Sequence, residues 1–516
     1  MISDAQEFFS FALSLLGAYL AWYLFTSSLQ YFQHRKYATS RGCRDPPFVS
    51  AKDPIFGLDY ALRLLSSVNS GSRGLSLREG FENLGTTYST NVYGTRKIMT
   101  ADPENIQAVF SKNSSAFGVE AIRNFTVGPI VGEGVMSMDG KVWSRSRTLM
   151  QPMVCKTEIV NLDSLSVHVS NLIDRLPKDE STVDMQDWFA SLGLDMVTEF
   201  LFGKSFSLLT SQCSDDAKEF LVAWKTVHPG MGKRTHIPKS NIFHWDKEFW
   251  SSCKVVRTFV EGVVHDALEE SKSTRNSIEP KHYVMVFDLV RRLKDTEDIV
   301  SQLLNVFLAG YDTTAILLSN VFFNFARYPT TFAKLRDEVR DENELTYSSL
   351  QRLPYLQKVI KETMRLNPPV GTMSRVVVDD VAVLPRGGGA SGDSPVFMKK
   401  GDLLQASFYT LHRNKSIYGE DVEIFNPGRW EDVAPTAWEF LPFGGGPRVC
   451  PGRNLAMVQA QFVLVRMLQA FDEIENRDPV FEFVELFKLV TESKNGVKVA
   501  LRPAGECHDE TQIALH

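Results

Sequence analysis

Residues 443–452 read Phe443-Gly-Gly-Gly-Pro-Arg-Val-Cys450-Pro-Gly452, a glycine-rich stretch that ends in a single cysteine. The apolar residues that follow recur every three or four positions from Leu455 to Val465, which predicts a helix beginning near Pro451. A thiolate at a helix N-terminus is stabilised by the dipole and by free backbone N–H groups. The glycines allow the backbone to approach a flat ligand closely, and Arg448 adds a cation. The stretch therefore predicts a binding site built around Cys450.

A second polar motif, Ala309-Gly-Tyr-Asp-Thr-Thr314, interrupts an apolar segment. That segment, residues 298–328, is predicted to be one helix about 46 Å long that runs through the core and is ended by Pro329. A threonine within a helix can bond its own i−4 carbonyl and bend the helix. The alternative is that the polar residues serve the chemistry of a site.

Three weaker motifs surround these two segments. Glu362-Thr-Met-Arg365 places an acid and a base at i, i+3 on one helix face, a common surface arrangement. Phe425-Asn-Pro-Gly-Arg-Trp430 follows downstream, and Trp143-Ser-Arg-Ser-Arg147 places its tryptophan and last arginine on one face of a predicted helix. Each is uninformative alone, and only their order along the chain adds weight.

Together these motifs resemble the cytochrome P-450 superfamily, whose heme signature F-x-x-G-x-R-x-C-x-G is matched by Phe443, Gly446, Arg448, Cys450 and Gly452. The resemblance implies a mainly α fold with small β-sheets, in which heme b lies between the long central helix and the helix after the cysteine. Cys450 would be the axial thiolate ligand of the heme iron. The fold would occupy residues 46–516 as one catalytic domain.

The resemblance also implies roles for individual residues. Arg448, Trp143, Arg147 and Arg375 would contact the heme propionates. Glu362, Arg365 and Arg429 would form a buried structural ion cluster. Thr313 with Asp312 would relay protons during oxygen activation, and Gly310 would leave room for dioxygen.

The predicted substrate pocket is mostly apolar. By family analogy its lining residues are Phe125, Ile130, Phe307, Ala309, Val370, Thr372 and Met373. An aliphatic or otherwise lipophilic substrate fits such a lining, although ordinary core packing explains each residue equally well.

Several short segments, for example residues 102–106 and 411–413, resemble the fungal branch of the superfamily that hydroxylates alkanes and fatty acids. Tyr311 stands where that branch usually has arginine, and residues 370–374 also depart from it. One reading is therefore hydroxylation of fatty acids or alkanes. Another is tailoring of a polyketide, terpenoid or lipopeptide in fungal secondary metabolism. A third, a non-catalytic heme protein, is disfavoured by the intact Asp312-Thr313 pair.

The N-terminus predicts a membrane anchor. Residues 8–33 form an uncharged run of 26 residues, which as a helix rises about 39 Å and can cross a bilayer. Acidic residues precede it and Arg35, Lys36, Arg41 and Arg44 follow it, which orients the rest of the chain toward the cytosol. We expect a single-pass endoplasmic reticulum protein with a span at about 8–28 and an anchor and hinge at 1–45. One alternative is a cleaved signal peptide, but the basic n-region that it would need is missing. The other alternative is a buried core helix.

Composition and partners complete the sequence prediction. The chain has 516 residues and a formal net charge of −6, which gives no basic field for nucleic acid. Its six cysteines include no CxxC pair and predict neither a disulfide framework nor a zinc site. The resemblance implies O2, a lipophilic substrate and NADPH–cytochrome P-450 reductase as partners. Lys141, Arg145 and Arg453 are candidate contacts for an acidic reductase surface.

Coarser patterns predict the remaining elements. Helices are expected at 143–153, 184–201, 246–272 and 353–365, and strands at 86–100, 376–384 and 396–405. The glycine-rich residues 386–395 lack the spacing of a phosphate loop and are expected to form a flexible surface hairpin.

Overall fold

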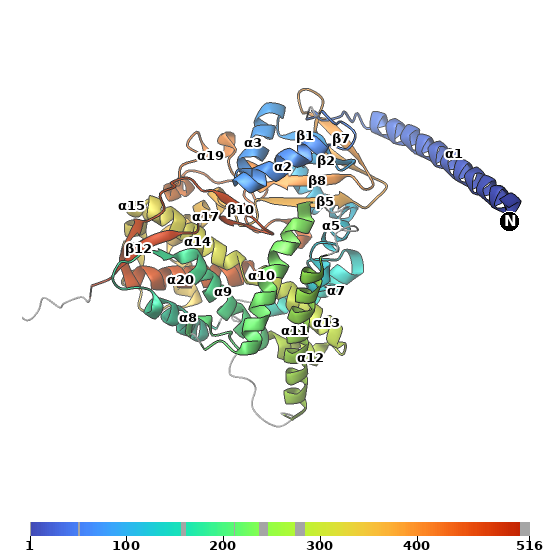
Figure 1. Ribbon diagram of the computed structural model, residues 1–516. Coiled ribbons are helices and arrows are strands. Elements are labelled where there is room, and N and C mark those ends of the chain that lie inside the picture. The colour runs from blue at the N-terminus through green and yellow to red at the C-terminus, as the bar shows by residue number, and fades with distance from the viewer. Residues whose placement is uncertain are drawn as a thin grey trace, which may run out of the picture.

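A computed structural model describes residues 2–49, 52–155, 161–210, 212–236, 246–273 and 284–505. Most of these residues are helical (Figure 1). The helices are α1 (Ile2–Ser40), α2 (Leu58–Ser70), α3 (Arg73–Leu84), α4 (Pro103–Gln107), α5 (Glu120–Arg123), α6 (Gly128–Val131), α7 (Gly140–Val154), α8 (Leu162–Arg175), α9 (Met185–Phe202), α10 (Asp215–His236), α11 (Lys247–Ser273), α12 (Met285–Arg292), α13 (Thr296–Gly310), α14 (Thr313–Arg327), α15 (Pro329–Val339), α16 (Tyr347–Gln351), α17 (Pro354–Leu366), α18 (Phe408–Leu411), α19 (Lys415–Tyr418) and α20 (Arg453–Ala470).

The strands form four small sheets. They are β1 (Thr87–Val92), β2 (Thr95–Thr100), β3 (Phe117–Gly118), β4 (Val183–Asp184), β5 (Thr372–Val377), β6 (Val381–Gly388), β7 (Ser394–Lys399), β8 (Leu403–Ser407), β9 (Phe471–Asn476), β10 (Glu485–Phe487), β11 (Thr491–Ser493) and β12 (Lys498–Pro503). The largest sheet has the order β1-β2-β8-β5-β3, with β2 and β8 parallel and its other neighbours antiparallel. The mainly α fold with small sheets predicted from the sequence is confirmed.

The predicted single central helix at 298–328 is wrong in one respect. The structure has two helices, α13 and α14, separated by a turn at Tyr311 and Asp312. The Thr313 hydroxyl donates to the Ala309 carbonyl at 2.8 Å across this turn. The apolar pattern could not reveal this, because it continues unchanged through the turn.

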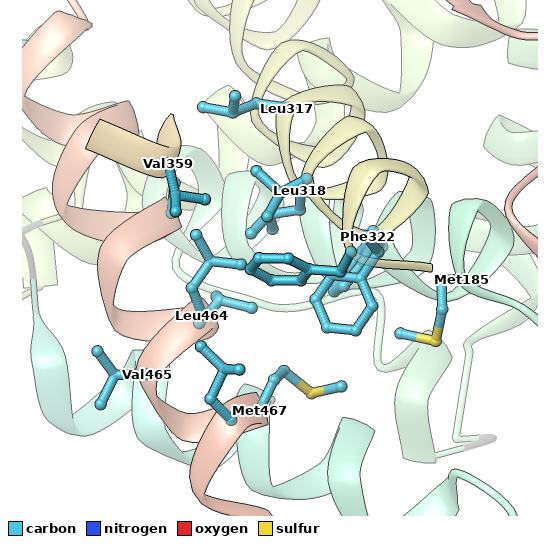
Figure 2. Close-up of a cluster of buried hydrophobic side chains, with 14 of the residues drawn as sticks. Met185, Leu317, Leu318, Phe322, Val359, Leu464, Val465 and Met467 are labelled. Carbon is cyan, nitrogen blue, oxygen red and sulfur yellow. The ribbon is translucent and has the colours of Figure 1, made fainter. Parts of the chain in front are cut away.

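The largest hydrophobic core joins α14 to α17 and α20. In Figure 2, Leu318 and Phe322 of α14 lie beside Val359 of α17 and Leu464 of α20. All four side chains are essentially inaccessible to solvent. Each contributes about 1.5–3 kcal/mol of burial free energy, so this packing fixes the helix that follows Cys450 against the central helix.

The predicted helices at 143–153, 184–201, 246–272 and 353–365 correspond to α7, α9, α11 and α17 within two or three residues at their ends. The helix predicted to begin near Pro451 begins at Arg453, two residues later.

The strands were predicted less well. Residues 86–100 form the antiparallel β1–β2 hairpin. The single strand expected at 376–384 is instead the end of β5 and the start of β6, and that expected at 396–405 is divided between β7 and β8. Short turns at 378–380 and 400–402 connect strands of different sheets. The alternation of apolar residues does not reveal such turns. Residues 386–395 lie in the β6–β7 hairpin, as expected.

The N-terminal helix α1 projects away from the rest of the protein (Figure 1). Its end contacts β7, where the His34 ring lies 5.4 Å from the ring of Phe397. Among the described residues, the segment long and apolar enough to cross a membrane is Thr296–Arg327; 72% of its most apolar window is buried, so it is a core segment. The anchor predicted at about 8–28 remains a prediction.

Candidate active site

The glycine-rich loop before Cys450 is closed by backbone geometry. The Cys450 N–H donates to the Phe443 carbonyl at 3.0 Å, and Phe443 packs against the main core. Gly446 has φ +69° and a Cβ there would lie 1.8 Å from the Phe110 carbonyl oxygen, so only glycine fits. At Gly452 an added Cβ would meet nothing within 4 Å. The loop is therefore a preformed support for the cysteine.

The Cys450 side chain is exposed, yet enclosure by protein raises the pKa of its thiol. Backbone bonding at Gly452 and the nearby Arg147 guanidinium oppose this increase. A second thiol lies close, because Cys155 at the end of α7 donates to the Pro451 carbonyl at 3.3 Å. The five cysteines in the described ranges are free thiols, and Cys507 lies outside those ranges.

Ala309 is exposed although its neighbours in α13 are largely buried. The helix that follows this turn, α14, packs on α20, which begins just after Cys450. An added Cβ at Gly310 would meet only Val197, at 3.3 Å. Thr313, partly buried, is held at this turn by its bond to Ala309.

Asp312 is buried and faces a histidine of α10. Its Oδ2 lies 3.2 Å from Nε2 of His228, and the two side chains are 11% and 7% exposed. Tyr311 packs edge-on against the His228 ring, 5.4 Å between centroids, and burial raises the pKa of the Tyr311 phenol well above its ordinary value. The acid of the central turn is therefore positioned by α10 as well as by its own helix.

Three guanidinium groups converge near Asp139 on the same side of the loop. Burial first, and then mutual repulsion, lowers the pKa of Arg123 to about 10 and that of Arg375 to about 9. Burial also lowers the pKa of Arg448, whose side chain donates to the Asp139 carboxylate and lies 4.5 Å above the Trp143 ring. Asp139 already accepts the backbone N–H groups of residues 119 and 120.

This charge balance tests whether heme fits. The arginine side chains outnumber the carboxylates here, so anionic groups such as the propionates of heme would be bound favourably. The flat, glycine-lined loop and the thiol complete a matching donor set. The residues present therefore fit heme. Trp143, Arg147, Arg375 and Arg448, all predicted to contact propionates, lie in or beside this cluster.

The predicted ion cluster is present and buried. Glu362 bonds Arg365 at 2.8 Å and Arg429 at 3.3 Å, and the Glu362 and Arg365 side chains are fully inaccessible. The Glu362 carboxylate also accepts the Trp430 indole N–H at 3.1 Å and the Asn426 backbone N–H at 3.0 Å. This cluster ties α17 to the segment leading into the Cys450 loop.

A buried histidine supports the same segment and should control acid stability. Nε2 of His412 accepts the Leu441 N–H at 2.9 Å, and burial lowers the pKa of His412 to about 3. Below pH about 6.5 His412 is protonated in the unfolded chain but stays neutral in the folded chain. The free energy of unfolding therefore falls by about 1.4 kcal/mol per pH unit toward pH 3. We expect His412→Gln to flatten this dependence, measured by urea unfolding across pH. His265→Gln, on the surface of α11, is the control; an equal slope in both variants would contradict the assignment.

The predicted pocket residues divide into groups. Ile130 and Phe307 are fully buried and pack in one core cluster with α10 and α11. Ala309 is exposed, and Val370, Thr372 and Met373 are partly buried. Phe125 is 57% exposed.

Sequence reasoning missed three residues of the site. Arg123 and Asp139 join the cation cluster, and His228 reaches Asp312 from a helix about 80 positions earlier in the chain. No sequence motif marks Arg123 or His228, because their roles depend on which distant segments the fold brings together.

Comparison with known proteins gives a consistent picture. A family model described as "Cytochrome P450" matches residues 60–497. "Cytochrome P450 monooxygenase himC" of Aspergillus japonicus is 35% identical over 476 residues, covering 90% of this chain and 85% of that protein. "Cytochrome P450 52A12" of Debaryomyces hansenii is 31% identical over 520 residues, covering 96% and 99%. "Cytochrome P450 monooxygenase fsdH" of Fusarium heterosporum is 32% identical over 514 residues, covering 96% and 90%.

Proposed function

Because the chain belongs to the cytochrome P450 monooxygenase family, we propose that it inserts one oxygen atom of O2 into a C–H bond of an aliphatic, lipophilic substrate. Electrons come from NADPH through a reductase. The observation that carries the proposal is the cation cluster of Arg123, Arg375 and Arg448 beside the glycine-rich loop that ends in Cys450. A fatty acid or an alkane is the substrate class we favour.

Each group has a distinct role. Heme b, when bound, supplies the oxygen activation and C–H oxidation chemistry. Cys450 Sγ would ligate its iron, and Arg123, Arg375 and Arg448 would neutralise its propionates. Thr313 Oγ1 would supply a transferable proton, and Asp312, which lies 3.2 Å from His228, would supply the next carboxylate of the relay.

The proton-relay role predicts uncoupling in Thr313→Ala. Without Oγ1 the ordered proton donor is lost, and we expect product formed per NADPH consumed to fall by about 10-fold or more, while NADPH consumption continues. Product and NADPH would be measured together. Thr313→Ser, which keeps the hydroxyl, should restore coupling; unchanged coupling in the alanine variant would exclude the relay.

The substrate assignment is tested by turnover. Membranes containing this protein and a fungal reductase would receive NADPH and saturated fatty acids of graded chain length, with products identified by mass spectrometry. A chain-length-dependent product heavier by one oxygen supports the proposal. If a preparation with an intact thiolate-heme spectrum gives no such product, a specialised metabolite is the better candidate. The aromatic group of Trp224, Phe307 and Tyr311, which departs from the alkane-hydroxylating pattern at Tyr311, favours that second candidate.

The reductase is expected to bind near the start of α20. Lys141 and Arg145 of α7 and Arg453 of α20 are exposed, and α7 reaches α20 through the Asn454–Cys155 hydrogen bond of 3.2 Å. Replacing the three residues by glutamine should lower reductase-supported turnover several-fold, because the reductase would associate more slowly without their charges. At low salt the association rate should fall roughly 10-fold. Peroxide-supported turnover should not change. Equal loss in both assays would reject this surface.

We also propose that α1 anchors the protein in the endoplasmic reticulum membrane, with the catalytic domain in the cytosol. A second apolar surface supports this location. Ile55, Phe56 and Leu62, at and before α2, are each more than half exposed. Such a patch suits contact with the apolar boundary of a lipid bilayer.

A further inference from the structure

A second cysteine borders the residues that follow Cys450. Cys155 is the C-cap of α7, and its thiol donates a hydrogen bond to the Pro451 carbonyl, with sulfur and oxygen 3.3 Å apart. In the opposite direction, the Asn454 side chain of α20 donates to the Cys155 carbonyl at 3.2 Å. Two hydrogen bonds therefore join the end of α7 to the start of α20 on either side of Pro451.

The position of the Cys155 thiol is fixed by its own helix. The Cys155 N–H donates to the Gln151 carbonyl at 3.1 Å, and the residue is partly buried. Within the part of the chain that the structure describes, no backbone N–H donates to the Pro451 carbonyl. An S–H group is a weak donor, but here it is the donor that the structure shows for this carbonyl.

The Pro451 carbonyl belongs to the same peptide unit as the Gly452 N–H. That N–H bonds to the Cys450 sulfur and opposes the increase that burial causes in the pKa of the Cys450 thiol. A hydrogen bond accepted by a peptide carbonyl makes the N–H of that unit a stronger donor, because linked hydrogen bonds polarise one another. The linked groups are, in order, Cys155 S–H, Pro451 C=O, Gly452 N–H and Cys450 Sγ.

The last bond of this series acts on the sulfur that would ligate heme iron. A hydrogen bond donated to a ligand sulfur withdraws electron density from it, and hydrogen bonds of this kind are one of the means by which proteins set reduction potentials. A less electron-rich sulfur stabilises the ferric iron less and so raises the potential. The Cys155 thiol can therefore affect the iron without contacting it.

We propose that Cys155 is a positioning residue for the ligand sulfur: through the Pro451–Gly452 peptide unit it strengthens the N–H bond to Cys450 and raises the reduction potential of the heme iron. The inference rests on the proposed role of Cys450 as the iron ligand. It adds to that role a side chain of α7 that lies almost 300 residues earlier in the sequence.

The test is a spectroelectrochemical titration of the purified holoenzyme, in which the heme absorption band reports the ratio of reduced to oxidised heme. In Cys155→Ala the Pro451 carbonyl loses its donor, and this ratio at a fixed applied potential is expected to fall about 1.5- to 4-fold. A fall of this size follows from weakening one charge-assisted hydrogen bond by about 10–30%. It corresponds to a shift of about 10–35 mV, since a tenfold change is about 59 mV for one electron.

Two further variants and a second measurement make the test specific. Cys155→Ser keeps a donor and should return the ratio toward that of the wild type. Cys213→Ala is the matched control, because Cys213 is another partly buried thiol that donates to a backbone carbonyl, that of Ser214. The infrared stretching frequency of carbon monoxide on the reduced heme should fall in Cys155→Ala alone, because a more electron-rich sulfur increases back-donation from iron.

Asn454→Ala gives an independent arm should Cys155→Ala fold poorly. Without the Asn454 amide the Cys155 backbone is held less firmly, so we expect a smaller fall in the same ratio. In the double variant Asn454→Ala should add nothing to Cys155→Ala, because it acts through the thiol. An equal effect of Asn454→Ala in both backgrounds would contradict the proposed route through Cys155.

The outcomes separate this inference from the proposed function. If the wild type has a thiolate-heme spectrum but Cys155→Ala changes neither the potential nor the carbon-monoxide frequency, Cys155 only packs α7 against the loop. The inference is then overturned, and the monooxygenase proposal stands. A lower free energy of unfolding in Cys155→Ala with an unchanged potential leads to the same conclusion. If the wild type itself lacks a thiolate-heme spectrum, Cys450 is not the ligand and both proposals fail.

Discussion

In Glu362→Ala the free energy of unfolding is expected to fall by about 3–5 kcal/mol, the range for removing one partner of a fully buried ion pair. The carboxylate accepts both Arg365 and Arg429, the Trp430 indole and a backbone N–H. Alanine would leave these donors buried without an acceptor. A loss of this size is a large share of the net stability of a domain, so we expect poor recovery of folded protein at growth temperature.

Urea unfolding followed by circular dichroism would measure the change. Lys358→Ala is the matched control, because it removes an ion pair on the same helix α17 whose partner, Glu431, lies on the surface. The control should be close to wild type. If Glu362→Ala and Lys358→Ala unfolded at similar urea concentrations, the buried cluster would not be a main support of the fold.

Cys450→Ala is expected to abolish monooxygenase turnover and the spectrum of a thiolate-ligated heme. Heme iron requires the anionic sulfur for oxygen cleavage, and alanine offers no ligand. The neighbouring thiol supplies a strict control, since Cys155 touches the same loop through the Pro451 carbonyl. Cys155→Ala should keep the thiolate spectrum, measured on the reduced carbon-monoxide complex. A normal spectrum in Cys450→Ala would transfer the ligand role to another residue.

The sequence predicts those structural features that a short, continuous stretch of residues determines. The loop of Phe443 to Gly452 and the Glu362–Arg365 pair are short patterns with fixed spacing, so their positions could be predicted before any fold was known. Helix extents such as α9 also follow from local apolar periodicity, reinforced by the Asp184 side chain that accepts the Gln186 N–H at 3.0 Å.

The missed features depend on contacts between distant segments or on a single side chain. The break at Tyr311 and Asp312 falls within an apolar pattern that continues unchanged on both sides of it. His228 acquires meaning only when α10 crosses the central helix at Asp312. The short turns that divide the predicted strands lie where pairing with one strand ends and pairing with another begins. Residue alternation does not predict these positions, because the partner strands set them.

The convergence of Arg123, Arg375 and Arg448 has a consequence for the stability of the chain before its cofactor binds. These residues span more than 300 positions of the chain, and their mutual repulsion destabilises the folded form in which they converge. A dianionic cofactor that binds only this form stabilises it by mass action. The chain without its cofactor is therefore expected to be less stable than the loaded protein, which a urea titration of the two forms would measure.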